Sequence, residues 1–395
     1  MFYDNNYSIL SKIINLLFAM KKLNLFFVMV FIYIMFSSLP VTAQEDTIRP
    51  YLLPVKGLCI KAPQPQHVDE FVQFIHDDLA AYGVNTLVLR VDYNYEYQSR
   101  PELRQKNPLT RNDVKKLVLA CQKENIRLIP QINLLGHQSW ASNLGKLLEV
   151  YPEFDETPHI EMPEEYEWPN EDGLYCKSYC PRHPLVHDVV FDLVDEIVEV
   201  FEADAFHAGM DEVFYIGNPK CPRCGGSDPA RLFAEEVRRI HDHLEEQNCE
   251  LWIWGDRLLD GKTTGLGMWQ ASMNNTYRAI DMIPQDVVIN DWHYNRAVPT
   301  AVHFAMKGFD VISCPYRNPE VAVNQVEQQV TYRSTSPAPM NSRFKGMMQT
   351  VWTDFKSFYE VFQGEKEPGD SVNNSVRSFR ELFERINEYQ NKTKL

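Results

Sequence analysis

Two adjacent carboxylates, Asp211 and Glu212, are the residues whose type and spacing most directly indicate chemistry in this sequence. They close an apolar run that begins at His207 and reads HAGMDE. Adjacent acidic side chains are costly unless a reaction uses them or a partner neutralises them. Neighbouring residues of a regular strand point to opposite sides, so a shared pocket for this pair requires a local twist or bulge. The alternative is that the pair only caps the helix that follows.

Aromatic and polar residues recur where other apolar runs end. Trp254, Trp292 and Trp352 close three of these runs, Asp92 closes another, and His137 follows a fifth. The flat apolar faces of sugar rings pack on indoles, while ring hydroxyls form hydrogen bonds with Asp, Asn, Arg and His. A single tryptophan in such a place is more often part of the core. Three at matching places favour a sugar pocket.

These residues need a scaffold that brings the ends of many strands together. Short β-rich runs alternate with amphipathic helical stretches, which is the pattern of parallel βαβ units. Eight strands are predicted, at 55–60, 86–92, 127–133, 205–212, 251–256, 287–292, 311–315 and 346–352. They predict an α/β fold with a single (β/α)8 barrel, in which polar residues at the carboxyl ends of the strands face the site.

Helical patterns lie between most of these strands. They cover 68–82, 112–125, 186–201, 229–248, 298–307 and, at the end of the chain, 371–389. Asn112 and Asp113 offer N-cap chemistry, and Gly308 stands where a helix should stop. The proline-rich stretch 150–184 is predicted to be a long loop over the active face, and a second loop is expected after Asp354.

The composition narrows the range of partners. The formal net charge is -15 and the isoelectric point is about 5.2, which argues against a basic, phosphate-binding surface and against nucleic acid as a partner. A glycan substrate is compatible with this charge.

The amino-terminal residues predict export. A pair of lysines precedes the apolar run 23–36, and a small-residue pattern ends at Ala43. This is the pattern of a cleavable signal peptide, and the run is too short for a comfortable membrane span. We assign 1–43 to the signal region, with Met20 as an alternative start, and 44–395 to the catalytic barrel. The mature protein is expected to span no membrane and to reside in a periplasm or outside the cell.

The eight cysteines admit more than one interpretation in an oxidising compartment. Cys176 and Cys180 form one loop pair and Cys221 and Cys224 another, and four such thiolates suit a structural zinc ion. The C-x3-C half is irregular, so one or two disulfides, or free thiols, are the alternatives. The other cysteines fall in apolar runs and are expected to be buried. No other cofactor is predicted.

The run HAGMDE resembles the His-x-Gly-x-Asp-Glu signature of the family 20 β-N-acetylhexosaminidases. Further motifs follow the family's order: the segment ending at His137 resembles P-E-x-D-x-P-G-H, Trp254-Gly-Asp256 resembles a Trp-Asp pair, and Trp352-Thr-Asp354 resembles Trp-x-Glu. The likeness extends over most of the mature chain. It is nearest to the short, hexosaminidase D-like form, which lacks the amino-terminal α/β domain of many members.

The resemblance implies hydrolysis with retention, in which the substrate's own acetamido oxygen attacks the anomeric carbon. Glu212 would protonate the leaving oxygen and then activate water. Asp211 would stay ionised, hold the acetamido N–H and stabilise the developing positive charge. A tyrosine hydroxyl should bind the acetamido oxygen, for which the motif order favours Tyr316, with Tyr294 as the alternative.

The resemblance also implies residues that assist the acid and grip the sugar. His137 and Asp92 stand where the family couples its acid to a histidine and a second aspartate, although His137 could instead brace its loop. No arginine follows the first strand, so Arg90 is the expected substitute. Asn318 and Asp354 stand where longer or charged groups are usual. The predicted substrate contacts are completed by His207, Trp254, Trp292 and Trp352.

Three functions compete at this point. We favour an exo-acting β-N-acetylhexosaminidase that releases terminal N-acetylglucosamine or N-acetylgalactosamine. The first alternative is a carbohydrate-binding member of the same family that has lost turnover or changed specificity, which the altered sugar contacts would explain. The second is a metal hydrolase or deacetylase, but His183, His187 and His293 lack zincin spacing. The natural glycan and the oligomeric state stay open.

Overall fold

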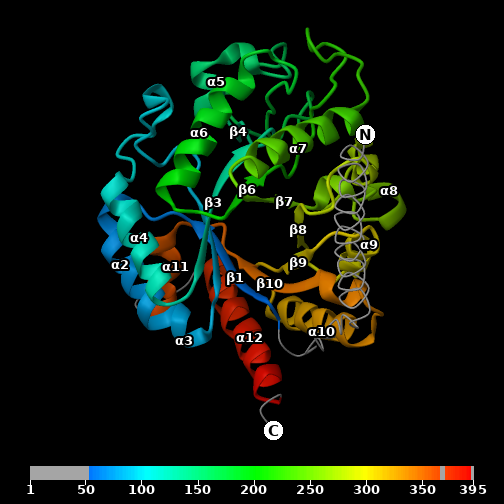
Figure 1. The fold of residues 1–395 in the computed structure, drawn as a ribbon. Coiled ribbons are helices and arrows are strands. Elements are labelled where there is room, and N and C mark those ends of the chain that lie inside the picture. Colours follow the sequence, from blue (N-terminus) through cyan, green and yellow to red (C-terminus); the bar gives the residue numbers. More distant parts are fainter. Residues whose placement is uncertain (1–52, 365–369, 393–395) are drawn as a thin grey trace, which may run out of the picture. The chain divides into compact units, whose positions relative to one another are not determined.

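The computed structural model describes residues 53–364 and 370–392, so the predicted signal region lies outside the described residues. Eight parallel strands form a closed barrel in the order β1-β10-β9-β8-β7-β6-β3-β2 (Figure 1). The strands are β1 (Val55–Lys61), β2 (Thr86–Arg90), β3 (Arg127–Leu134), β6 (Ala205–Gly209), β7 (Glu250–Trp254), β8 (Val288–Trp292), β9 (Val311–Cys314) and β10 (Phe344–Thr350). The predicted (β/α)8 barrel is confirmed.

Side chains alternate between the inside of the barrel and its outer surface. In β2, Leu87 and Leu89 pack in the large cluster under the helices, whereas Val88 belongs to a smaller cluster to which all eight strands contribute. This alternation follows from the period of two along a strand. Because the inside is filled with side chains, the chemistry must lie at an end of the barrel.

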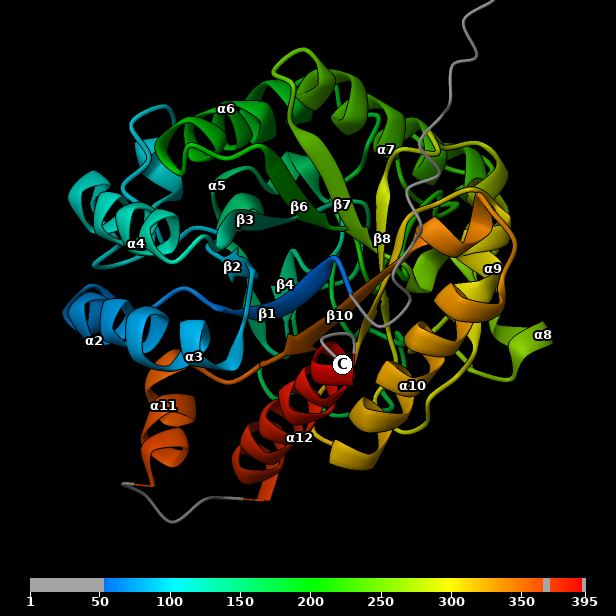
Figure 2. The ribbon, with the colours of Figure 1, turned by 60° about the horizontal axis from the view of Figure 1, so that its bottom comes forward.

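Helices surround the strands (Figure 2). They are α2 (Val68–Gln73), a π-helical turn (Phe74–Leu79), α3 (Ala80–Tyr82), α4 (Arg111–Lys123), α5 (Lys146–Val150), α6 (Val186–Val200), α7 (Pro229–Glu245), α8 (Gly261–Thr264), α9 (Thr300–Met306), α10 (Pro319–Thr335), α11 (Phe355–Gln363) and α12 (Asp370–Lys392). A two-stranded hairpin, β4 (Ser139–Trp140) and β5 (Asn143–Leu144), follows β3. Within the described part of the chain, no helix is long and apolar enough to span a membrane.

Helix α10 was not predicted, because its buried face is largely polar. Gln325 donates to the carbonyl of His293 at 3.1 Å, and Gln329 donates to Ser313 Oγ at 2.8 Å. Both glutamines are buried. Their hydrogen bonds satisfy polar groups against the barrel, so the helix shows no clear apolar period in the sequence.

The loop predicted after Asp354 is wrong, because α11 begins there. Asp354 caps this helix by accepting from the backbone N–H of Ser357 at 3.0 Å. Phe355, Phe358 and Phe362 lie on its buried face. For α4, Thr110 rather than Asn112 is the N-cap, and it forms a capping box with Asp113. In the loop predicted at 150–184, Val150 ends α5 and Pro152–Phe154 forms a 3-10 turn, and the stretch 155–184 contains neither helix nor strand.

Candidate active site

A cavity of about 730 Å³ opens at the carboxyl ends of the strands. Strand ends supply Arg90, Asn133, Asp211, Glu212, Trp292, Tyr294 and Trp352 to its lining. Loops supply His137, Ser139, Trp140, Tyr175, Trp269, Gln270, Asn295 and Arg317. Seven residues named from the sequence as catalytic or sugar-binding therefore meet in one cavity, namely Arg90, His137, Asp211, Glu212, Trp292, Tyr294 and Trp352.

The backbone after β6 explains how both adjacent carboxylates reach this cavity. Gly209, Met210 and Glu212 have positive φ angles of 69°, 68° and 49°, so the chain leaves the strand geometry before the pair. Such conformations are uncommon for residues other than glycine and mark functional sites when the surrounding structure enforces them. At Gly209 a Cβ atom would lie 2.3 Å from Asn133 Oδ1, so a side chain there would collide with β3. The expected local bulge is present.

His137 bridges the two carboxylates. Its Nε2 atom lies 3.2 Å from Asp211 Oδ2 and 3.2 Å from Glu212 Oε2. The loop that carries it is pressed against the pair, because a Cβ at Gly136 would lie 2.5 Å from the carbonyl oxygen of Asp211. The other carboxylate oxygen of Asp211, Oδ1, is buried and has no hydrogen-bond partner among the described residues. A free acceptor of this kind is suited to a donor on a bound molecule.

The surroundings shift the pKa values of Asp211 and Glu212 in opposite directions. Burial raises the pKa of Glu212, and the hydrogen bond from His137 offsets this only in part. Burial also disfavours ionisation of Asp211, but the adjacent His137 outweighs it and holds the pKa of Asp211 below its ordinary value. Burial by itself would lower the pKa of His137, but Asp211 and Cys176 together outweigh it and hold this pKa well above its ordinary value. The site thus favours a protonated Glu212 beside an ionised Asp211.

A buried ion pair between Asp256 and Arg257 holds the backbone of Glu212. Asp256 Oδ2 accepts the backbone N–H of Glu212 at 3.0 Å and the Nε–H of Arg257 at 2.6 Å. Its other oxygen accepts from Trp292 Nε1 at 3.3 Å. Asp256 therefore connects the backbone of the acid to an aromatic side chain of the cavity.

Arg90, Trp352 and Tyr294 form a connected group on another side of the cavity. The guanidinium of Arg90 lies 4.5 Å from the centre of the Trp352 ring and donates to the carbonyl of Val351 at 3.1 Å. Trp352 Nε1 donates to the hydroxyl of Tyr294 at 2.9 Å. Arg90 Nε is buried and without a partner in the described ranges. The group presents two ring faces and spare donors to the cavity.

Several predicted residues lie outside the cavity lining, and local structure explains each case. The hydroxyl of Tyr316 lies 3.3 Å from Ser371 Oγ, so it faces α12 rather than the pair. Asn318 and Asp354 accept backbone N–H groups at the starts of α10 and α11, and therefore act as helix caps. The motif order alone could not distinguish these positions from inward-facing ones.

Three further predicted residues also lie outside the cavity lining, namely Trp254, His207 and Asp92. Trp254 is fully buried, with its ring 5.8 Å from that of Trp352 and 4.5 Å from that of His207. Burial lowers the pKa of His207 to about 3, so this imidazole is neutral. The carboxylate of Asp92 accepts the backbone N–H of Asn133 at 2.9 Å. His137 is hydrogen-bonded to Asp211 and lies 3.2 Å from Glu212, and among the described residues no hydrogen bond joins it to Asp92.

The sequence reasoning missed an aromatic wall formed by loops. Tyr175 packs against Trp269 at 4.6 Å and against Trp140 at 4.9 Å, measured between ring centres. Trp140 stands only three residues after His137 in the sequence, which was a usable signal. Trp269 lies in the loop between β7 and β8, where no motif marks it.

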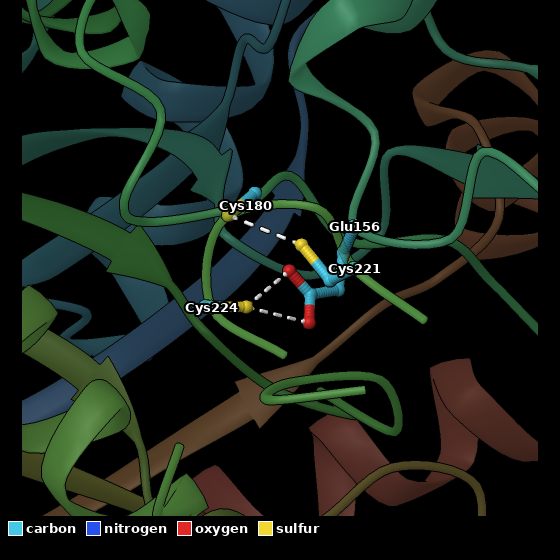
Figure 3. A group of neighbouring side chains, drawn as sticks. All are labelled: Glu156, Cys180, Cys221 and Cys224. Carbon is cyan, nitrogen blue, oxygen red and sulfur yellow. Dashed lines mark hydrogen bonds between the residues drawn. The ribbon is translucent and has the colours of Figure 1, made fainter. Parts of the chain in front are cut away.

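Among the described residues, three groups of side chains could hold a metal; His241, Asp242 and Glu245 form a mostly exposed one, and the other two are mostly buried. One is His137 with Asp211 and Glu212. The other joins Cys180, Cys221 and Cys224 with Glu156, not with Cys176 (Figure 3). Cys176 instead lies beside Glu212, with its Sγ 3.5 Å from the carbonyl oxygen of that residue. The predicted set of four cysteines is therefore not the one that converges here, because Glu156 takes the place expected for Cys176. All eight cysteines are buried, and none forms a disulfide in this structure.

Comparison with known proteins finds similarity to glycoside hydrolases. Residues 67–363 match the model of the glycosyl hydrolase family 20 catalytic domain. A β-hexosaminidase of Emericella nidulans is 24% identical over 213 residues, which are 51% of this chain and 31% of that protein. A lacto-N-biosidase of Bifidobacterium bifidum is 24% identical over 223 residues, which are 53% of this chain and 18% of that protein. The chain thus spans less than a third of the length of these curated relatives.

Solved structures share the fold. The X-ray structure of a Flavobacterium johnsoniae chitobiase superposes with a TM-score of 0.57 at 15% identity, covering 86% of this chain and 52% of that one. At this identity the likeness concerns the fold alone.

Proposed function

Because the chain belongs to glycosyl hydrolase family 20, we propose that it is a retaining, exo-acting β-N-acetylhexosaminidase that removes terminal N-acetylglucosamine or N-acetylgalactosamine from glycans. The observation that carries the proposal is the pair itself. Glu212 has a raised pKa beside Asp211 with a lowered one, and both line a cavity with aromatic walls. The names of the relatives agree with this chemistry.

Glu212 is the proton donor in this mechanism. A raised pKa keeps its carboxyl protonated at a pH where an ordinary glutamate is ionised, so it can protonate the glycosidic oxygen as the bond breaks. The carboxylate that remains then takes a proton from the water that attacks the intermediate. The ion pair of Asp256 with Arg257 holds the backbone of Glu212 in place throughout.

Asp211 and Tyr294 orient the acetamido group of the substrate. The unpartnered Oδ1 of Asp211 accepts the acetamido N–H, and its negative charge stabilises the positive charge that spreads over the oxazolinium ring. The hydroxyl of Tyr294 accepts from Trp352, which leaves its own proton to donate to the acetamido oxygen. We assign this role to Tyr294 in place of Tyr316, because Tyr294 lines the cavity.

Trp292, Trp352 and Arg90 form the sugar-binding surface. The two indoles offer flat faces to the pyranose ring, and Arg90 Nε offers a donor to a ring hydroxyl. Arg90 thus takes the place of the arginine that is absent after the first strand.

The test is hydrolysis of aryl β-N-acetylglucosaminide and β-N-acetylgalactosaminide, with and without a thiazoline mimic of the oxazolinium intermediate. We expect release of the aryl group and inhibition by the thiazoline. Binding of N-acetylglucosamine without any release would instead favour the carbohydrate-binding alternative. Mass analysis of the product of a natural oligosaccharide tests exo action, because a released disaccharide would contradict single-residue cleavage.

Glu212→Gln sharpens this test. The acid helps poor leaving groups most, so the variant should lose about 10²- to 10⁴-fold on an alkyl glycoside and much less on a nitrophenyl glycoside. An equal loss on both substrates would contradict the acid role. Glu384→Gln on the exposed face of α12 is the matched control and should retain full activity.

We also propose that the protein is exported by a cleavable signal within 1–43, on the basis of the lysine pair and the apolar run. Expression of the whole chain in a Gram-negative host tests this. The mature amino terminus should begin near residue 44 and appear outside the cytoplasm, whereas uncleaved protein in the cytoplasm would refute it.

A further inference from the structure

A buried cluster of Glu156, Cys180, Cys221 and Cys224 lies apart from the proposed reaction (Figure 3). Cys180 Sγ and Cys221 Sγ are 3.6 Å apart, and Cys224 Sγ lies 2.9 Å from each carboxylate oxygen of Glu156. The four ligand atoms all lie within 4.8 Å of one another. At most 5% of any of these residues is exposed. Three sulfur atoms and a carboxylate therefore converge on one enclosed point.

The carboxylate of Glu156 has no cationic side chain to balance it. In residues 53–364 and 370–392, Glu156 takes part in no ion pair with Lys, Arg or His. The buried Lys177 nearby pairs with Asp155 at 2.6 Å instead. Glu156 accepts one backbone N–H, from Asn218 at 2.9 Å. A buried carboxylate next to thiols requires a proton or a cation, and thiols that face it share that requirement.

We propose that this cluster binds one Zn²⁺ through Cys180, Cys221, Cys224 and Glu156. Zinc prefers four ligands in a tetrahedron, with sulfur at about 2.3 Å, which places two sulfurs about 3.8 Å apart. The Cys180–Cys221 separation of 3.6 Å meets that requirement with little movement. Soft thiolate ligands select zinc over magnesium or calcium. A site with four protein ligands leaves no open position, so the ion is structural.

The tight turn at 221–225 carries two of the proposed ligands, Cys221 and Cys224. Cys221-Pro-Arg-Cys224 is followed by Gly225, whose N–H donates to the carbonyl of Cys221 at 3.2 Å. A Cβ at Gly225 would lie 2.6 Å from that same oxygen, so a larger residue would open the turn. The tight turn brings both cysteines of the C-x2-C pair to the same side.

The proposed ion would join two loops that flank the cavity. Glu156 and Cys180 belong to the long loop between β3 and α6, which also carries Tyr175 of the aromatic wall. Cys221 and Cys224 belong to the loop that follows Asp211 and Glu212. Tyr175 packs on Phe214 of this second loop, with ring centres 5.5 Å apart. The zinc therefore acts as a crosslink that fixes the aromatic wall relative to the catalytic pair.

Metal analysis of the whole chain, purified without chelator, is the first test. We expect about one zinc per chain. Cys224→Ser should lose the zinc, whereas Cys176→Ser should keep it, because Cys176 lies outside the cluster. Loss of zinc in Cys176→Ser, or retention in Cys224→Ser, would overturn the proposed ligand set.

A spectroscopic test covers the case in which Cys224→Ser fails to fold. Folded wild-type protein is treated with an organomercurial that titrates thiols, and zinc release is followed with a chromogenic chelator. In a separate sample that has not been treated with the mercurial, the zinc is exchanged for Co²⁺, and the visible spectrum is recorded. Tetrahedral thiolate coordination gives intense bands of d–d and sulfur-to-metal charge-transfer origin, and Glu156→Gln should shift these bands while leaving the charge-transfer intensity.

A disulfide is the competing outcome. If Cys180 and Cys221 were joined, the intact mass would fall by two hydrogens, the protein would contain no zinc, and Co²⁺ would give no charge-transfer band. That result would overturn the proposal. Because every readout concerns metal or thiols, failure here leaves the proposed glycosidase activity untouched.

Discussion

The two walls of the cavity are built in different ways. The strand-end wall, defined as Arg90, Asp211, Glu212, Trp292 and Trp352, is attached to the barrel. The loop wall, defined as Trp140, Tyr175 and Trp269, stands on the loops after β3 and β7. Trp292 is 7% exposed, whereas Trp140 is 53% exposed.

The walls also differ in what positions their side chains. Hydrogen bonds and a strained backbone fix the strand-end wall, as at Glu212, whose N–H binds Asp256. Edge-to-face ring contacts position the loop wall, as between Tyr175 and Trp269. Bond breaking needs groups held to within a fraction of an ångström, whereas recognition of varied glycans tolerates a softer surface. We therefore expect kcat to depend on the first wall and KM on the second.

After Glu212→Gln on a poor leaving group, the largest effect is expected for Asp211→Asn. The substitution keeps the shape of the side chain but removes the charge that stabilises the intermediate in the proposed mechanism, so kcat should fall by about 10²- to 10³-fold. Asp354→Asn, at the exposed start of α11, is the control and should change kcat little. Steady-state kinetics with an aryl N-acetylglucosaminide provide the measurement, with the melting temperature recorded to confirm folding. Near-normal turnover by Asp211→Asn would remove Asp211 from the mechanism.

A comparison of two tyrosines is expected to give the next largest effect. Tyr294→Phe removes the proposed donor to the acetamido oxygen and should lower kcat/KM by about 10- to 100-fold. Tyr316→Phe removes only the contact with Ser371 and should leave kcat/KM within about twofold. The reverse order would restore the assignment drawn from the motif order.

Trp269→Ala probes the loop wall. One aromatic contact is worth roughly 1 kcal/mol, so KM for a chitooligosaccharide should rise about fivefold with kcat unchanged. A short aryl glycoside, which reaches less of this wall, should be affected less. If kcat fell as far as in Asp211→Asn, the division of labour between the walls would be refuted.

The smallest effect is expected in the pH profile. The proposed mechanism requires ionised Asp211 and protonated Glu212, so kcat/KM should fall as acid protonates Asp211 and fall again as base deprotonates Glu212. His137 lowers the pKa of both acids, and His137→Asn should therefore move both limbs to higher pH. His67→Asn, at the start of α2, is the control. An unshifted profile in His137→Asn would show that His137 only braces its loop.

The strands and their polar ends could be predicted because they depend on local pattern. Each of the eight predicted strands overlaps an observed one, and the barrel then forces their carboxyl ends together. Asp211 and Glu212, at the end of one strand, therefore had to lie near the residues at the ends of the other strands. The meeting of Arg90 with Trp352 follows from the same reasoning.

The remaining features depend on directions and contacts that a pattern does not encode. Tyr294 and Tyr316 both follow strands, and only the local backbone decides which one faces the cavity. Trp269 is an isolated aromatic in a loop. Glu156 is distant in sequence from Cys180 and Cys221, so no spacing rule could add it to the thiols. Helix α10 was hidden because hydrogen-bonded glutamines replaced apolar residues on its buried face.

The closure of the barrel has a consequence for how the protein reaches its native state. β1 pairs with β10 in parallel, with Val55 opposite Gly346, so the first and last strands are neighbours. Until β10 is available, the growing sheet keeps two unpaired edges, which are templates for aggregation. Pairing across such a sequence separation is slow, because the loop-closure entropy is lost before the contacts form. We expect refolding from denaturant to be slow and to give lower yields as the protein concentration rises.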